Sequence, residues 1–301
     1  MGKYINPFTD YGFKKLFGEE AGKNSLKSFL NDILPIKDKI EEITFLKNEQ
    51  LGTSEEKRNA VYDIFCKDKA GNQFIVEMQN AKQVYFKDRA VFYSTFPIQN
   101  QAKKREWDFA LKKVYCVGLL GFNISKSEEV SEEILYEKEY LHEVKLKNQK
   151  NEVFYDKLTF IFVEFLNFNK EENELENHLE KWLYFLKNLD TLDSIPEILK
   201  EEVFEEAFET ASFYKMNEIE RENYERSLKV FRDNINVIKT ARIEGYQDGF
   251  DEGIREGIRE GIRNTVVKML KKKITVEDIM EITSLTKNEI EKIEQELNGE
   301  R

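Results

Sequence analysis

One short stretch of the chain is almost wholly apolar, and it constrains the fold more than any other stretch does. Residues 113–122, KVYCVGLLGF, carry a single charged side chain, the lysine at their start. A short apolar run of this kind is typical of a strand in the middle of a sheet, where both faces are covered. The chain therefore has to build a sheet around this strand and cover it with helices.

Two further strands are predicted close to one another, at 60–68 (AVYDIFCKD) and 73–81 (QFIVEMQNA). The residues between them form a turn with Gly71 at its tip, so we expect the two strands to be antiparallel neighbours. Both strands place hydrophobic residues on either side of an acidic one, which suits a sheet covered on both faces. The remaining strands of this β-rich half are expected at 42–47, 156–166 and part of 133–141.

Helices are expected on both sides of these strands. Residues 8–34 repeat apolar side chains at spacings of three and four around Gly18–Gly22, which predicts two amphipathic helical stretches. Asp10 is a candidate N-cap for the first of them. Residues 83–107 predict a helix that is interrupted near Pro97.

The charge of the chain is distributed unevenly. The formal net charge is −11, yet residues 1–121 hold 20 basic and 16 acidic side chains, whereas residues 170–226 hold 7 and 17. The acidity therefore belongs to a segment of predicted helices that begins near residue 172. The N-terminal part remains free to meet a polyanion.

Several classes of protein are excluded by what the sequence lacks. No run of about eighteen apolar residues is present, so we expect no membrane span, and the first residues have no apolar signal-peptide region. Cys66 and Cys116 lie in apolar runs, which favours buried thiols in a reducing, cytoplasmic setting. His142 and His178 are the only histidines and have no Cys/His cluster nearby, so neither a zinc site nor a His-dependent triad is expected.

Three polar residues of the paired strands form the candidate site: Asp63, Glu77 and Gln79. Glu77 and Gln79 are two apart on one strand and so share a face, and Asp63 lies close to Glu77 if the strands pair. Carboxylates that converge among apolar residues need a cation between them, and Mg²⁺ prefers a few carboxylate oxygens together with water and substrate phosphate. The alternative is that Asp63 and Glu77 face solvent beside Lys67 and Lys69.

The internal repeat lies near the C-terminus, where glycine recurs at every fourth position: Gly245, Gly249, Gly253, Gly257 and Gly261. On a helix this spacing places small residues along one slowly drifting stripe, which allows another helix to approach closely. We therefore expect residues 239–301 to support a homo-oligomer, such as a dimer; a weakly helical linker is the alternative. Residues 275–297 predict two short helices without a basic recognition face, which favours a packing role over DNA reading.

The order of these elements resembles the core of the PD-(D/E)XK nucleases, and the whole chain is similar to the PD-(D/E)XK nuclease family transposases, the recombination-promoting nucleases. The resemblance is carried by FTDYGFKKLFG at 8–18, by VYDIF and FIVEMQ within 61–79, and by the glycine repeat with its terminal helical pair. It implies an α/β fold whose restriction-endonuclease-like core is a mixed central sheet flanked by helices, followed by an α-helical C-terminal region. It also implies a metal-dependent deoxyribonuclease that uses Mg²⁺, or Mn²⁺ in its place, and has DNA as its partner.

Carried over residue by residue, the resemblance makes Asp63 and Glu77 metal ligands and puts Gln79 where the superfamily usually has lysine. Lysine would position the attacking water and offset charge in the transition state. Glutamine can orient a water by hydrogen bonding but brings no positive charge. Lys14 and Lys82 are the candidates for supplying that charge.

Other residues are candidates for a supporting role. Arg89 and Tyr93, four apart on one helical face, resemble the Gln-x-x-x-Tyr box of RecB-like nucleases, although Tyr93 also suits a hydrophobic core. Asp10 heads the first helix, where such folds often place another acidic group.

Lys103, Lys104 and Arg105 are candidates to contact the DNA backbone, because lysines and arginines near aromatic residues suit phosphate binding and base stacking. A solvated helix terminus gives the same pattern, since cations favour that end of a helix.

The sequence thus predicts three regions: a nuclease-like core at 1–168, an acidic helical region at 169–238, and the glycine-repeat helix with its terminal helical pair at 239–301. The favoured function is a Mg²⁺-dependent DNA endonuclease of low sequence specificity, in recombination, mobile-element or defence biology. The competing hypothesis is a catalytically silent scaffold that assembles through the glycine-repeat helix. A third hypothesis makes the C-terminal region an intramolecular regulator that covers the active face.

Overall fold

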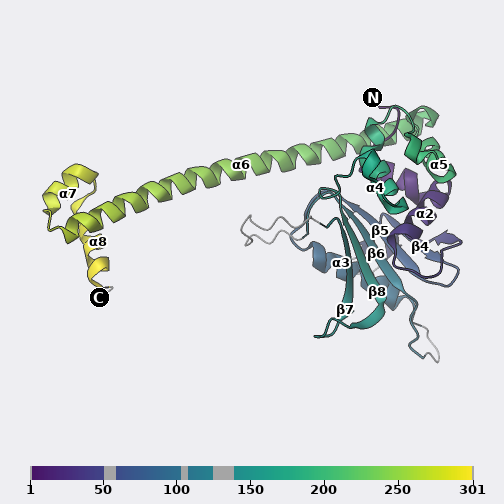
Figure 1. The fold of residues 1–301 in the computed structure, drawn as a ribbon, viewed down its shortest axis with the longest axis horizontal. Helices are drawn as coiled ribbons and strands as arrows, with labels where there is room; N and C mark the ends of the chain where they lie inside the picture. The colour runs from purple at the N-terminus through teal and green to yellow at the C-terminus, as the bar shows by residue number, and fades with distance from the viewer. Residues whose placement is uncertain (1, 51–58, 103–107, 125–138, 300–301) are drawn as a thin grey trace. The chain divides into compact units, whose positions relative to one another are not determined.

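The computed structural model describes residues 2–50, 59–102, 108–124 and 139–299 (Figure 1). The chain divides into two compact units, residues 1–233 and 234–301. Within the described ranges, no helix combines the length and the apolar character that a membrane span requires.

A mixed six-stranded sheet forms the centre of the first unit, in the order β1-β4-β5-β6-β8-β7. Its middle strands β5, β6 and β8 run parallel, while β1, β4 and β7 pair antiparallel to their neighbours. The bounds are β1 Ile43–Phe45, β4 Ile64–Asp68, β5 Gln73–Gln79, β6 Val114–Leu120, β7 Leu141–Lys147 and β8 Val153–Glu164. The expected mixed sheet flanked by helices is confirmed, and every residue of the predicted central strand β6 is buried.

Two strands differ from their predicted bounds. The strand expected at 60–68 is broken into β3 (Ala60–Val61) and β4, and β3 pairs instead with β2 (Glu49–Gln50) in a separate two-stranded sheet. The strand expected within 133–141 falls largely outside the described residues, and β7 begins where that segment ends. The turn between β4 and β5 is as predicted, with Gly71 at a φ of +87° that favours glycine.

Helices cover both faces of the sheet (Figure 1). The face that carries Phe74 and Val76 packs against α2 (Lys23–Ile33), α4 (His178–Asn188) and α5 (Glu202–Thr210), and we call it the packed face. The opposite face carries Ile75 and packs against α3 (Phe86–Gln99), and we call it the site face. The predicted break near Pro97 is wrong, because Pro97 lies inside the last turn of α3.

The N-terminal segment forms α1 (Asp10–Phe13), the π-helix η1 (Lys14–Gly18) and the 3₁₀ turn η2 (Glu20–Gly22) before α2. Thr9 caps α1, since its hydroxyl accepts a hydrogen bond from the Gly12 N–H, so the cap predicted at Asp10 is wrong. Gly22 is required by close approach: a Cβ there would lie 2.0 Å from the Leu16 carbonyl oxygen.

Residues near the end of the first unit form hydrogen bonds with its N-terminal segment. Tyr4 forms a β-bridge with Ser212, the Asn6 N–H donates to the Tyr224 hydroxyl over 2.8 Å, and the Tyr11 N–H donates to Ser227 Oγ over 3.0 Å. The acidic region expected at 169–238 is therefore packed into the first unit as far as Asp233. Short 3₁₀ turns connect its helices: η3 Glu172–Glu174, η4 Leu189–Thr191, η5 Glu197–Leu199 and η6 Phe213–Lys215.

The second unit is built on the greater part of helix α6 (Glu218–Lys271), followed by α7 (Val276–Thr283) and α8 (Lys287–Gly299). Its small core is formed by Val266, Ile279 and Ile290, one residue from each helix. The five repeated glycines of α6 lie on open surface, where a Cβ added at any of them would meet no atom within 4 Å beyond the adjoining residues and backbone of the helix itself.

Candidate nuclease site

The candidate carboxylates meet where the ladder between β4 and β5 ends. Ile64 and Val76 form the last paired rung, and Asp63 and Glu77 are the next residues on the two strands. Both side chains are partly buried. The predicted proximity of these two residues is therefore found in the structure.

Each carboxylate takes the place of a backbone acceptor of the ladder. The Asp63 N–H donates to Glu77 Oε1 over 3.2 Å, and the Met78 N–H donates to Asp63 Oδ2 over 2.8 Å. We call this reciprocal pair of bonds the carboxylate clasp. It explains the break in the predicted strand, because side chains rather than backbone carbonyls accept the hydrogen bonds beyond Ile64.

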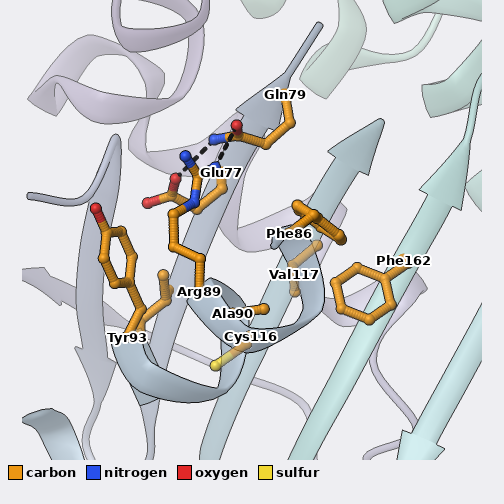
Figure 2. Close-up of a pocket in the computed structure, with 11 residues that line it drawn as sticks. Glu77, Gln79, Phe86, Arg89, Ala90, Tyr93, Cys116, Val117 and Phe162 are labelled. Carbon is orange, nitrogen blue, oxygen red and sulfur yellow. Dashed lines mark hydrogen bonds between the residues drawn. The ribbon is translucent and has the colours of Figure 1, made fainter. Parts of the chain in front are cut away.

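Gln79 continues the site along β5. Its Nε2 donates to Glu77 Oε2 over 3.0 Å, and its Oε1 accepts a hydrogen bond from an Arg89 guanidinium nitrogen over 2.5 Å (Figure 2). The same guanidinium donates to Gln83 Oε1 over 2.5 Å and lies 5.7 Å from the centre of the Tyr93 ring. Sequence spacing did not predict the contact between Arg89 and Gln79, which depends on where α3 docks against the sheet.

The pKa values of both carboxyls are raised above their ordinary range. Burial is the main cause for Glu77, and the negative charge of Asp63 adds to it. Burial also raises the pKa of Asp63, against the opposing effects of the Met78 N–H and of Lys14. Two facing carboxyls whose charged forms are both disfavoured are stabilised by a cation placed between them.

This donor set fits a divalent cation such as Mg²⁺. Magnesium is usually bound by one or two carboxylates, with waters and substrate phosphates completing its octahedron. Across the described ranges no group of three or more His, Cys, Asp and Glu side chains converges as a complete cage. Asp63 and Glu77 are thus the residues of this chain that would hold the ion, with substrate supplying further oxygens.

The N-terminal segment places Asp10 and Lys14 within electrostatic reach of Asp63. Asp10 raises the pKa of Asp63 and Lys14 lowers it. The two residues form an ion pair with each other, with Lys14 Nζ 2.6 Å from Asp10 Oδ1. Lys82, in contrast, is exposed in the loop after β5 and forms no ion pair with any described carboxylate.

Tyr93 joins α3 to the strand that leads into Asp63. Its backbone carbonyl accepts a hydrogen bond from the Tyr62 hydroxyl over 2.9 Å, and the two rings meet edge to face. Burial raises the pKa of Tyr62, which keeps its hydroxyl a donor. Tyr93 therefore contacts both the guanidinium of Arg89 and the core of the site face, and its part in a box like that of the RecB-like nucleases stays a prediction.

A small pocket lies beneath Arg89 and Gln79 (Figure 2). Its volume of about 30 Å³ is enough for a water-sized ligand. Glu77, Gln79 and Arg89 are among the lining residues, together with Cys116, Gly118 and Phe162, and the surface that they present to the pocket is almost entirely apolar. Gly118 stands beside Glu77 in the sheet, where a Cβ would lie 2.9 Å from the Phe162 ring.

Asn48 is a supporting residue that the sequence analysis missed. Its side-chain amide donates to the backbone carbonyl of Asp63 over 2.9 Å, and its backbone carbonyl accepts from the Tyr62 N–H over 3.1 Å. It lies just beyond the strand predicted at 42–47. Its polar neighbours Lys47 and Glu49 give no signal that this residue holds Asp63 in place.

The predicted DNA-backbone residues Lys103, Lys104 and Arg105 lie outside the described residues.

Comparison with known protein families supplies one match, over residues 7–241, to the family described as PD-(D/E)XK nuclease family transposase. The matched range includes the carboxylate clasp, Gln79 and all of α3. Comparisons with curated proteins and with solved structures give no match.

Proposed function

Since the chain belongs to the PD-(D/E)XK nuclease family transposases, we propose that it is a Mg²⁺-dependent endonuclease that hydrolyses DNA phosphodiester bonds, with Mn²⁺ as an alternative ion. The observation that carries the proposal is the carboxylate clasp, which holds Asp63 and Glu77 next to each other at the end of the ladder. Family membership supports a nuclease in general, and the clasp supports Asp63 and Glu77 as the residues that would bind the metal ion.

Asp63 and Glu77 hold the metal ion in this mechanism. When bound, Mg²⁺ lowers the pKa of a bound water and polarises a phosphoryl oxygen. The chain itself fixes the two carboxylates through backbone N–H groups, so little rearrangement is needed when substrate arrives. Gln79 directs its amide toward the same space and orients the attacking water by hydrogen bonding.

Low sequence specificity is part of the proposal. Neither of the terminal helices α7 and α8 has a basic face that would read bases, and α8 begins KNEIEKIEQEL with more acidic than basic residues. Cleavage without base readout suits a role in promoting recombination, or in mobile-element or defence biology.

Cleavage of supercoiled plasmid tests the proposal. Wild-type protein with Mg²⁺ should nick or linearise the plasmid, and both EDTA and Asp63→Ala should abolish the reaction. Asp88→Ala is the matched control, because Asp88 is an exposed carboxylate on α3. It should cleave like the wild type.

The silent-scaffold hypothesis makes the opposite prediction. On that hypothesis wild type and Asp63→Ala are equally inactive, and Mg²⁺ leaves the melting temperature of both unchanged. Equal activity in both would indicate a contaminating nuclease or a site elsewhere in the chain.

Self-association through α6 is a second part of the proposal. Each repeated glycine is followed by an apolar residue, and Tyr246, Phe250, Ile254 and Ile258 are between 46% and 76% exposed. The glycines and these residues form two neighbouring rows, each with a four-residue spacing. The row of glycines is a groove, and the row of large apolar side chains is a ridge beside it. The ridge of one copy fits the groove of a second copy, which is the packing that crosses helices at about −50°.

Alanine substitutions at the repeated glycines distinguish their effect on the stability of the single helix from their effect on the association of two copies. Gly253→Ala/Gly257→Ala should stabilise an isolated helix by about 1 kcal/mol per site, since the added methyl groups meet no atom within 4 Å beyond the adjoining residues and backbone of the helix itself. The same methyl groups fill the groove and should weaken the dimer in sedimentation velocity. Arg255→Ala, in the same turn but outside the stripe, is the control; a dimer that survives the double substitution contradicts this part of the proposal.

A further inference from the structure

The side-chain amide of Gln79 lies between a cation and an anion. Its Oε1 is 2.5 Å from the guanidinium of Arg89, and its Nε2 is 3.0 Å from the carboxylate of Glu77. The three groups come from one strand and one helix, with Arg89 ten residues after Gln79 in the chain (Figure 2).

When Glu77 is ionised, as it must be to hold a cation, only one orientation of this amide is compatible with its neighbours. A guanidinium has donors and no acceptor, and an ionised carboxylate has acceptors and no donor. Turning the amide over would set its NH₂ group against the guanidinium and its oxygen against Glu77. A donor would then face a donor at Arg89, and an acceptor would face an acceptor at Glu77. Two charge-assisted hydrogen bonds would be lost.

We propose that Arg89 is a positioning residue that holds the amide of Gln79 as a hydrogen-bond donor toward the reacting phosphate and its water. The inference rests on the proposed nuclease function and deepens it. The NH₂ group has two hydrogens, of which one is given to Glu77. The second is left for an oxygen of water or phosphate, and the guanidinium supplies its positive charge from behind the amide.

Arg89 is itself held in place, which a positioning residue requires. Its second hydrogen bond goes to Gln83 Oε1, and the Tyr93 ring lies beneath its guanidinium. Arg89 is partly buried, whereas Lys87, on the same helix, is exposed. Lys87 thus carries the same charge two residues away without lining the pocket beneath Gln79.

The first test compares three variants of the full-length protein in a steady-state cleavage assay with Mg²⁺. Arg89→Gln should lower kcat by about 10- to 100-fold, as loss of a group that orients a ligand usually does, and leave KM within about twofold. Lys87→Gln is the matched control for charge and should leave kcat unchanged. Arg89→Gln/Gln79→Lys returns a charged donor to the site and should recover at least tenfold of the lost kcat.

The second test does not depend on cleavage. In ¹⁵N-labelled protein, the Gln79 side-chain NH₂ signal, assigned by its loss in Gln79→Lys, should be protected from exchange in the wild type. It should keep this protection in Lys87→Gln and lose it in Arg89→Gln.

The inference is overturned if Arg89→Gln matches Lys87→Gln in kcat, if Arg89→Gln/Gln79→Lys is no more active than Arg89→Gln, or if the Gln79 signal is equally protected in the wild type, Lys87→Gln and Arg89→Gln. A wild type without metal-dependent cleavage would reject the proposed nuclease, and the exchange of the Gln79 amide would then decide the positioning role by itself.

Discussion

The two faces of the central sheet differ in kind although they alternate along the same strands. On β5, Phe74, Val76 and Met78 point into the larger core and are at most 9% exposed. Glu77 and Gln79 stand between them in sequence and point to the other face, where they bond with Asp63 and Arg89. Because successive side chains of a strand point to opposite faces, one segment supplies both the core side chains of the packed face and the polar side chains of the candidate site.

This difference indicates that the packed face contributes most to the stability of the fold, whereas the site face keeps side chains that are costly to bury. Helices α2, α4 and α5 bury aromatic side chains against the packed face, among them Trp182 and Phe204 with no exposed surface. The site face holds two carboxyls whose charged forms are disfavoured by burial. Changes on the packed face should therefore affect stability, and changes in the site should affect activity.

The largest expected effect is on the packed face. Phe74→Ala should lower the free energy of unfolding by about 3–5 kcal/mol, because it removes a buried aromatic ring and leaves a cavity. Urea denaturation followed by circular dichroism measures the change. Gln79→Ala on the site face is the comparison and should cost about 1 kcal/mol; equal losses would remove the distinction between the faces.

Asp63→Asn should have the opposite effect to Phe74→Ala, with a large loss of activity and little loss of stability. Cleavage should fall by about 10²- to 10³-fold, comparable to the loss of an electrostatic catalytic group, while the melting temperature stays equal or rises. The amide oxygen still accepts the Met78 N–H, and the negative charge that raises the pKa of Glu77 is gone. Plasmid cleavage and calorimetry measure the two quantities, and a large fall in melting temperature would mean that the clasp also sustains the fold.

Tyr62→Phe tests the link between α3 and the strand before Asp63. It removes the hydrogen bond to the Tyr93 carbonyl and should lower the free energy of unfolding by about 1 kcal/mol. Tyr115→Phe, on the packed face, is the control, because among the described residues its hydroxyl has no hydrogen-bond partner. Thermal denaturation of both variants distinguishes a local brace from a general effect of losing a hydroxyl.

The smallest effect concerns pH and the helices behind the packed face. His178 Nδ1 lies 2.5 Å from Asp32 Oδ2, and Nε2 lies 3.2 Å from Glu201 Oε2, so the ring joins α2, α4 and the residue before α5. The hydrogen bond to Asp32 raises the pKa of His178 above its ordinary value near 6.5. Because the folded pKa is the higher one, this stabilisation is complete below the unfolded value and is lost as pH rises through the folded value.

The measurement compares wild type with His178→Gln by urea denaturation at several pH values. The stability advantage of the wild type should be greatest near about pH 6 and should shrink as the solution becomes alkaline. An advantage that grows with pH would contradict the assignment, because it would mean that the neutral ring is the form stabilised by folding.

Much of the fold could be predicted because its signals are local. The apolar run 113–122, the turn at Gly71 and the spacing from Asp63 to Glu77 each depend on a few neighbouring residues. Those signals are enough to predict neighbouring strands around a buried central one and to bring the two carboxylates together, whereas the mixed sheet was implied by the family resemblance.

The features that were missed depend on contacts between distant segments. Thr9 rather than Asp10 caps α1, and the ladder breaks at Asp63 because side chains accept its bonds. The bond from Arg89 to Gln79 follows from the docking of α3, which no periodicity encodes. The glutamine in the usual lysine place was visible in the sequence and Arg89 was a candidate for a supporting role, but the hydrogen bond between the two was not predicted.

The fastening of the N-terminus by the start of α6 has a consequence for the synthesis of the protein. Asn6 and Tyr11 find their partners at Tyr224 and Ser227, 218 and 216 residues later. Asp10 and Lys14 lie in the segment held by these bonds, so on the ribosome their surroundings are completed only after residue 227 has emerged. A nascent chain that already contains Asp63, Glu77 and Arg89 still lacks these contacts, and a truncated product ending before α6 would lack the hydrogen bonds that hold the segment of Asp10 and Lys14.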